Sequence, residues 1–251
     1  MPIQIGFPEL PPSESDAFFY ILKLWLEDCD TNHDCRGVFT GIMPTRLVDV
    51  GTAGHPTLRL IESHAEVASS KYIAISHPWG DGRDRPFFTT TSENVKAFRY
   101  AIPEHQLPMT LADIVYCTRK LGIQYLWIDC LCIIQGKDGD FAQEAKKMES
   151  AFSGAYCVFS VDRATDHHSG FLRPRPRPNY VTFQRGSEEP FHVCEIIDNF
   201  AEDALNSPLN RRAWSLQQRA LARRTIYFTE NQNYFECGEG IRCETLSKMH
   251  R

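Results

Sequence analysis

The sequence predicts an α/β fold: three layers built on a mainly parallel central sheet, with accessory hairpins and helices. Over residues 71–162, strand-like and helix-like segments follow the order strand, helix, helix, strand, helix, strand, which is typical of a parallel sheet with right-handed crossovers. The content of 42% hydrophobic and 24% charged residues is that of an ordinary globular protein. We expect one domain in three parts: residues 1–65 (N-terminal helix and hairpin), 66–172 (α/β core) and 173–251 (C-terminal accessory layer).

The N-terminal part predicts a helix and a hairpin. Ser13 is the expected N-cap of a helix of about four turns, and apolar residues then repeat at helical spacing at Phe18, Ile21, Leu22 and Trp25. Two alternating segments, Arg46–Val50 and Thr57–Ile61, flank a Gly-rich turn and predict an antiparallel hairpin. We expect this hairpin to pack beside the main sheet.

The helices and strands of the core are predicted from the spacing of apolar residues and from the residues that end each segment. Helical segments show apolar residues on one face, and Gly122 ends the second of them, whereas the strands are short apolar runs. The predicted elements, in order, are strand 71–76, helix 92–100, helix 110–121, strand 125–134, helix 140–149 and strand 155–161.

The most apolar stretch is Tyr125–Gln135, which predicts a buried central strand. It is rich in β-branched and aromatic residues and ends at a Gly-containing turn, residues 136–139. Asp129 interrupts it, and a buried carboxylate is costly unless it is paired or hydrogen-bonded. Asp129 is therefore either a site residue facing a cleft or a structural residue that caps the following turn.

Three polar residues, Ser76, Asp129 and Asp162, fall at the carboxyl ends of the predicted core strands. In open α/β sheets the ligand cleft lies at this edge, so we look for a site there. The loop 77–86 after the first core strand carries Trp79, whose ring either stacks on a planar ligand or folds back over the sheet edge.

Nine cysteines are many for 251 residues, but the number is odd and several lie in apolar segments. We therefore expect buried thiols rather than a disulfide framework. Cys29, His33 and Cys35 form a Cys-x3-His-x-Cys cluster whose spacing is not a usual zinc signature. A zinc site would need a distant fourth ligand such as Cys237 or Cys243, so we expect a loop with incidental thiols and assign no metal ligand.

The C-terminal part opens with the alternating Arg-Pro run 173–178, which must be extended. Its arginines suit phosphate binding, but a spacer is the favoured interpretation. A strand over 191–197, a helix over 212–221 and a hairpin of 225–228 with 234–237 follow. No phosphate-cradling glycine loop or nucleophile elbow is found in the sequence.

The net charge of −5 and the pI near 6.0 argue against sequence-independent nucleic-acid binding. No apolar run approaches the roughly 20 residues of a membrane span. The opening residues lack the features of a signal peptide. We expect a soluble, cytoplasmic protein.

These segments resemble, in order, those of the fungal heterokaryon-incompatibility (HET) domain family. The most specific are the Tyr-Leu-Trp-Ile-Asp-x-Leu-Cys-Ile-Ile-Gln run over 125–135 and the Arg-Ala-Trp-x-Leu-Gln segment from Arg212. Three departures are His77-Pro78 before Trp-Gly, Cys130 in place of a common Ser, and Gln218 in place of the usual Glu. The resemblance implies a protein of non-self recognition that triggers programmed cell death in incompatible fused cells.

The HET domain is also distantly similar to the TIR fold, a flavodoxin-like arrangement, and some TIR domains cleave the nicotinamide–ribose bond of NAD. Their catalytic carboxylate lies in a Trp-x-x-Glu pattern on the helix after a central strand, where this chain has Phe141-Ala142-Gln143-Glu144. The resemblance thus implies Glu144 as the catalytic carboxylate. The alternative is that Glu144 is a first-turn acid paired with Lys147 or Lys146.

Two hypotheses follow from this resemblance. In the first, the chain is an NAD hydrolase: Glu144 is catalytic, Trp79 stacks on a ring, and Ser76, Asp129 and Arg85 bind ribose or phosphate. NAD is then a substrate, and no tightly bound cofactor is expected. In the second, it is a non-enzymatic death-signalling module that works by self-assembly or through another incompatibility or receptor protein. The two differ in whether Glu144, Trp79 and Asp129 converge around a pocket.

Overall fold

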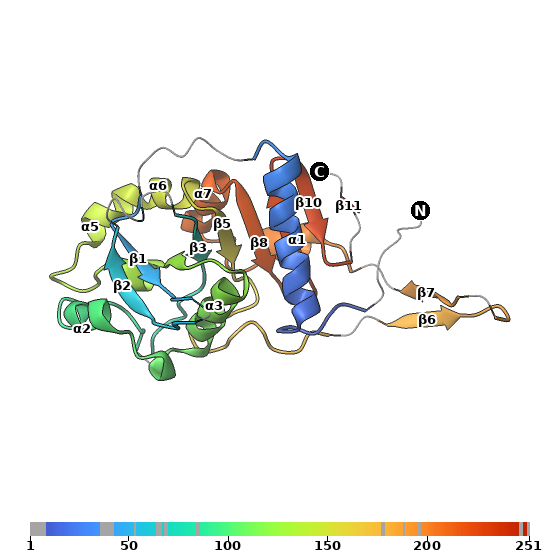
Figure 1. Cartoon of the computed structure of the whole chain (residues 1–251), viewed down its shortest axis with the longest axis horizontal. Coiled ribbons are helices and arrows are strands. Elements are labelled where there is room, and N and C mark those ends of the chain that lie inside the picture. The colour runs from blue at the N-terminus through green and yellow to red at the C-terminus, as the bar shows by residue number, and fades with distance from the viewer. Residues whose placement is uncertain are drawn as a thin grey trace.

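The computed structural model (Figure 1) shows an α/β arrangement with helices on both faces of one large sheet. It describes residues 9–35, 43–52, 54–63, 67, 70–83, 86–176, 179–187, 189–194, 197–245 and 248–249. In this part of the chain, no helix is long and apolar enough to cross a membrane.

The main sheet has nine strands among the described residues, in the order β11-β10-β9-β8-β5-β3-β4-β1-β2. Their bounds are β1 (Arg46–Asp49), β2 (Arg59–Glu62), β3 (Tyr72–Ser76), β4 (Tyr125–Trp127), β5 (Cys157–Ser160), β8 (Arg224–Phe228), β9 (Asn233–Cys237), β10 (Gly240–Cys243) and β11 (Lys248–Met249).

The sheet is mixed rather than mainly parallel. Only its centre is parallel, through the pairs β4–β3, β3–β5 and β5–β8. The flanks are antiparallel, because β1–β2 and β8–β9–β10 are joined by short hairpin connections, which only antiparallel strands allow. The predicted hairpins therefore form as expected, but they extend the sheet instead of lying beside it.

The prediction of one strand over residues 125–134 is wrong beyond Trp127. The run is buried as expected, but after β4 it turns into one helical turn, α4 (Asp129–Cys132). The Asp129 carboxylate accepts the backbone N–H of Cys130 at 2.7 Å, and the Cys132 N–H donates to the Ile128 carbonyl at 2.8 Å. These bonds satisfy the backbone within the turn and end the strand.

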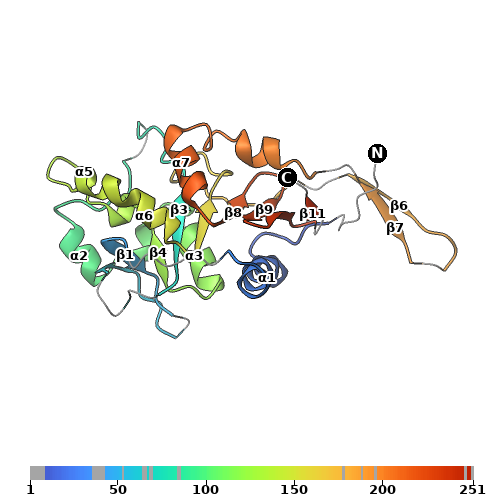
Figure 2. The same ribbon diagram turned by 90° about the horizontal axis from the view of Figure 1, so that it is seen from above.

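The helices are α1 (Asp16–Asn32), α2 (Val95–Tyr100), α3 (Met109–Lys120), α5 (Phe141–Glu144), α6 (Met148–Ser153) and α7 (Ala213–Leu221), with short turns η2 (Glu104–Gln106), η3 (Ala145–Lys147) and the π-helical η4 (Ala201–Leu205). Figure 2 shows α1 and α3 on one side of the sheet and α6 and α7 on the other. The predicted helix over 140–149 is thus divided among α5, η3 and α6.

Helix α1 begins two residues later than predicted, since its N-cap is Ser15, whose hydroxyl accepts the Phe18 N–H at 3.2 Å. The helix packs on strands from the far end of the chain. Trp25 stacks on Phe235 with ring centroids 6.1 Å apart, and Asp30 accepts a 2.6 Å bond from Arg224. The N-terminal helix therefore packs on the strands that come from the C-terminal part of the chain.

Strands β6 (Tyr180–Phe183) and β7 (Phe191–Cys194) form a separate antiparallel hairpin that projects from the body (Figure 1). It contains the start of the strand predicted over 191–197. All four residues of β6 are exposed. Val181 and Val193 remain 60% and 54% exposed, so apolar side chains of this hairpin face solvent.

The Arg-Pro run before this hairpin is held by carboxylates of the body. Arg173 donates to Glu230 at 2.7 Å, and Arg175 forms a buried ion pair with Glu244. Arg175 also donates to the carbonyl of Pro11 at 2.7 Å. Both described arginines of the run are used internally, which favours the spacer interpretation over phosphate binding.

Candidate functional site

A cavity of about 380 Å³ opens at the carboxyl ends of β3 and β4, beneath α7. It has the size expected for a small-molecule site. The side chains that matter for its chemistry are Ser76, Trp79, Asp129, Arg212, Trp214 and Gln218. The sheet places the first three here, because Ser76 ends β3 and Asp129 follows β4 in the parallel part of the sheet.

Asp129 is the central acidic group of the cavity. Both of its carboxylate oxygens lie 3.2 Å from Nε1 of Trp79, and its side chain is 26% exposed. Burial raises the pKa of Asp129 to about 6, although the N–H groups of Cys130 and Trp79 and the charge of Arg212 act in the opposite direction. Asp129 therefore changes charge close to neutral pH, as acid–base and charge-stabilising groups often do.

Two buried histidines lie behind Asp129. Nε2 of His77 and Nε2 of His167 are 3.1 Å apart, and Nδ1 of His77 lies 4.0 Å from Asp129. Burial lowers the pKa of both rings, that of His167 to about 4, so both imidazoles are neutral at pH 7 and one donates to the other. His77 lines the cavity, and its hydrogen bond with His167 holds the ring in place.

Cys130 joins these histidines in a group whose donor atoms lie within 4.8 Å of one another. The group offers three donors, and the facing Nε2 atoms of His77 and His167 are already used in their mutual hydrogen bond. Three donors are one fewer than the four protein ligands that close a structural zinc site, so we assign no metal ion to this group.

Helix α7 covers the cavity and supplies its polar roof. The Ser76 hydroxyl donates to Oε1 of Gln218 at 2.5 Å, which links the end of β3 to the helix. Trp214, at the start of α7, is 58% exposed, and Arg212 precedes it. An aromatic ring and a cation thus stand at the open side of the cavity.

The structure brings together three of the predicted site residues: Ser76, Trp79 and Asp129. Trp79 both covers the sheet end, by bonding to Asp129, and lines the cavity. Arg85 lies outside the described residues. Asp162 follows β5 at the same edge but accepts hydrogen bonds from Ser207 and from Asn210, the latter at 2.8 Å.

Glu144 is not among the residues that line this cavity. Its side chain is 8% exposed, and Oε1 accepts bonds from Thr45 Oγ1 and Lys147 Nζ, both at 2.9 Å. The expected pairing with Lys147 is present, and it connects α5 to the loop before β1. The catalytic role of Glu144 stays a prediction.

Sequence reasoning did not select Arg212, Trp214, His77 or His167 as site residues. The Arg-Ala-Trp segment does contain a signal, since a cation and an aromatic residue precede the helix whose Gln218 meets Ser76. His167 carries no such signal, because it lies 90 residues from its partner His77 and only the fold brings them together.

A larger cavity, of about 990 Å³, is lined by residues of α7, β8 and β9. Its lining includes Arg219 and Glu236, which pair with each other at 3.0 Å, and Tyr227 donates to Glu236 at 2.7 Å. These charged groups satisfy one another. We therefore take the smaller cavity as the candidate site, because it contains Asp129, whose pKa is raised and whose side chain is 26% exposed.

The fold and the site together define an α/β domain with a ligand-sized cavity at the carboxyl ends of its parallel strands. A family model described as "Heterokaryon incompatibility protein (HET)" matches residues 72–218, more than half of the chain. The chain belongs to the heterokaryon incompatibility family. The matched region includes every residue that lines the 380 Å³ cavity, but none of the elements α1, β1, β9 and β10. No curated protein and no solved structure matched the chain, and the similarity to TIR domains stays a prediction.

Proposed function

We propose that the chain is the death-triggering domain of a fungal non-self-recognition system and that it acts by cleaving the nicotinamide–ribose bond of NAD. Family membership supports the first part. The observation that carries the second is the Asp129 carboxyl, which has a raised pKa and lies beside the Trp79 indole in the wall of a cavity.

The chemistry requires an anion next to a developing cation. When the C1′–N bond breaks, nicotinamide leaves with the bonding electron pair and positive charge builds on the ribosyl ring. A carboxylate beside the ring stabilises this charge, and water then adds to C1′ and loses a proton. Asp129 is placed to supply that carboxylate, in preference to Glu144, whose Oε1 is engaged by Thr45 and Lys147.

The surrounding residues suit the rest of the substrate. Trp79 and Trp214 offer aromatic surface for the nicotinamide ring, and the Ser76 hydroxyl is within the cavity to bind ribose. Arg212 offers a cation for the phosphates. A volume of about 380 Å³ is at the small end of ligand sites, so we expect the nicotinamide riboside half inside and the remainder across the open side.

The test compares two carboxylates within one protein. NAD turnover by wild type is measured beside Asp129→Asn and Glu144→Gln, with circular dichroism as the check of folding. We expect Asp129→Asn to lower kcat/KM by about 100-fold or more, the usual effect of removing a charge-stabilising group, and Glu144→Gln to retain turnover. Loss of turnover in folded Glu144→Gln alone would instead support the TIR-like assignment. Absence of turnover in wild type, even at high protein concentration, would refute the enzymatic proposal.

A second candidate function is self-assembly, and the projecting β6–β7 hairpin favours it. Phe183 and Phe191 stack with centroids 5.2 Å apart and are 48% and 59% exposed. A projecting two-stranded hairpin with exposed apolar side chains can pair with a second copy by adding strands at its edges.

Light scattering during gel filtration tests this second candidate. We expect the double substitution Val181→Lys and Phe191→Lys to abolish concentration-dependent association. Tyr100→Lys, at an 88% exposed aromatic residue on α2, serves as the control and should leave association unchanged. A wild-type protein that stays monomeric at all concentrations would contradict self-assembly.

A further inference from the structure

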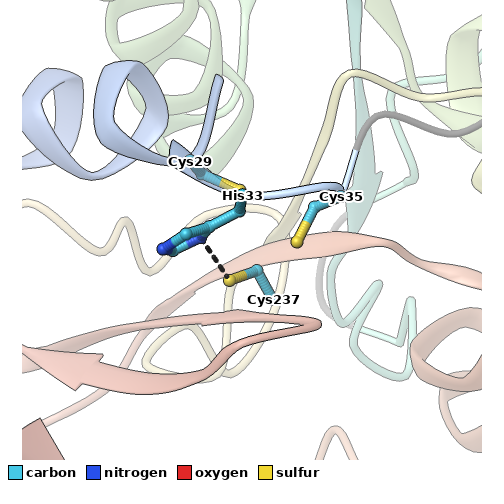
Figure 3. A group of neighbouring side chains, drawn as sticks. All are labelled: Cys29, His33, Cys35 and Cys237. Carbon is cyan, nitrogen blue, oxygen red and sulfur yellow. Dashed lines mark hydrogen bonds between the residues drawn. The ribbon is translucent and has the colours of Figure 1, made fainter. Parts of the chain in front are cut away.

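Four potential metal ligands from the two ends of the chain meet beside the main sheet, away from the cavity of Asp129. Cys29 lies in the last turns of α1, His33 directly follows the helix and Cys35 lies two residues further on. Cys237 ends β9, more than 200 residues later. Figure 3 shows the imidazole and the three sulfur atoms turned toward a common space.

We propose that Cys29, His33, Cys35 and Cys237 bind a structural Zn²⁺ ion. One donor atom from each residue lies within 4.8 Å of all the others. A Cys3His set is a common ligand set of structural zinc sites, in which four protein ligands close a tetrahedron. The sequence indicated three of these residues and left Cys237 and Cys243 as alternatives for the fourth, and the fold brings Cys237 to the end of α1.

The separations agree with the size of a zinc tetrahedron. Zn–S bonds of about 2.3 Å and Zn–N bonds of about 2.0–2.1 Å place neighbouring S and N ligand atoms about 3.6 Å apart. Cys237 Sγ and His33 Nδ1 are 3.4 Å apart. The other pairs of donor atoms lie within 4.8 Å of one another, close enough for one ion to lie among all four.

The groups around the ligands also suit a metal. Nε2 of His33, the nitrogen not turned to the thiols, lies 3.3 Å from the Arg242 guanidinium and 3.7 Å from the Asp28 carboxylate, so with an ion on Nδ1 the Nε2–H would have to turn from Arg242 to Asp28, the kind of carboxylate partner that supports a zinc-bound imidazole. The backbone N–H of Glu239 donates to Cys237 Sγ. Such N–H groups stabilise a thiolate.

The turn after Cys237 leaves the space that the site needs. A Cβ atom at Gly238 would lie 3.2 Å from Cys35 Sγ, tighter than ordinary contact, so a side chain there would press on the ligand. Zn²⁺ with three thiolates carries a net charge of −1, and the Arg224 guanidinium close to Cys29 offsets that charge.

The site has a structural consequence that differs from the proposed enzymatic function. It would tie α1 to the β9–β10 hairpin and so close the N-terminal helix onto the C-terminal strands. None of its four residues falls within residues 72–218, the part matched by the family model. The zinc proposal and the NAD proposal therefore stand or fall separately.

Metal analysis of the whole chain, purified under reducing conditions, tests the proposal. After incubation with Zn²⁺ and exhaustive dialysis, we expect about one zinc ion per chain in wild type and less than about a tenth of that in Cys35→Ala and Cys237→Ala. Cys117→Ala is the matched control, since it removes a buried cysteine of α3 that is outside the cluster, and it should keep the full zinc content.

A second measurement on wild type does not depend on the variants folding. Replacing zinc by Co²⁺ should give the intense visible bands of tetrahedral cobalt with thiolate ligands, and chelation should lower the melting temperature. Wild-type protein that retains no zinc and gives no such bands would overturn the proposal, as would a Cys35–Cys237 disulfide or stoichiometric iron. Equal zinc loss in Cys117→Ala would show non-specific binding and would also overturn it.

Discussion

Asp129 shows how one residue links stability to the proposed chemistry. Its folded-state pKa of about 6 lies above the value of about 3.9 for an unfolded aspartate. The folded state therefore binds this proton more tightly, so the stability contributed by Asp129 is largest below about pH 4 and is lost as pH rises through 6.

We expect Asp129→Asn to reveal this loss. Asparagine keeps an acceptor for the Trp79 N–H but does not ionise. The unfolding free energy of the wild type, relative to that of the variant, should therefore fall by about 2 kcal/mol from pH 4.5 to 7.5. Urea unfolding at both pH values measures it. Asp162, whose pKa burial also raises to about 6, is present in both proteins and cancels. A difference that does not change with pH would mean that Asp129 has an ordinary pKa.

The same titration should govern catalysis, with the opposite sign. A charge-stabilising carboxylate works only when ionised, so NAD turnover should rise as pH increases through about 6 and level off above 7. The pH profile of kcat/KM measures this. If turnover instead falls over this range, Asp129 acts in its protonated form and the proposed role is wrong.

Some of these residue positions follow from the sequence and others do not. Ser76 and Asp129 were predicted to lie together because each follows a buried strand, and the carboxyl ends of parallel strands share one edge. The pairing of Ser76 with Gln218 joins residues 142 apart, which no local pattern specifies. Glu144 was selected by resemblance alone, and its hydrogen bonds depend on Thr45, from a distant part of the chain.

Among the elements, the hairpin β1–β2 is fixed to the core by Arg46. This guanidinium is 5% exposed, donates to the Cys132 carbonyl at 2.7 Å and pairs with Asp140. It thereby caps the end of α4 and holds the turn before α5. A buried cation of this kind is costly to remove, because its partners are left unpaired.

We expect Arg46→Met to lower the unfolding free energy by roughly 3–5 kcal/mol. The matched control is Arg99→Met, because Arg99 pairs with Glu62 of the same hairpin and both partners are partly exposed, at 49% and 29%. That change should cost about 1 kcal/mol or less. Chemical unfolding of both variants measures the two losses in unfolding free energy. Equal losses would show that the burial of Arg46 does not raise the cost of removing it.

The run 125–135 shows that burial could be predicted from the sequence where secondary structure could not. Its burial was predicted correctly, since Leu126, Leu131 and Ile133 are each 1% exposed. Its conformation was not, because an apolar run suits a buried strand and a buried helical turn alike. The decision rests on the Asp129 carboxylate, which bonds to the following N–H and begins α4.

For the whole molecule, the Arg-Pro run acts as a strap between the N-terminal segment and the last strands. Arg175 and Glu244 are 6% and 0% exposed, Glu244 also accepts the Asn233 N–H at 2.6 Å, and Arg175 reaches Pro11. One buried ion pair thus holds three distant segments together.

We expect Arg175→Met to free this strap and raise its rate of cleavage by protease several-fold, since the exposed strap would then open locally. Arg173→Met is the control: it removes the neighbouring pair with Glu230, in which both partners are partly exposed, at 42% and 51%. Limited proteolysis followed by mass spectrometry gives both rates. Unchanged cleavage in Arg175→Met would show that the prolines alone hold the strap.

The packing of α1 against β8 and β9 shows that the region matched by the family model is smaller than the folded unit. The part of the chain that is recognisably shared with relatives, residues 72–218, ends before β8 and starts after β1. A fragment cut at those limits would leave β5 and β4 as bare edges of a three-stranded parallel sheet and would lose both α1 and the strand β9 on which Trp25 rests. The matched region therefore contains the residues of the proposed chemistry, but the unit that we expect to fold on its own is larger and includes the elements on both sides of it. A shortened version of this domain should keep those elements.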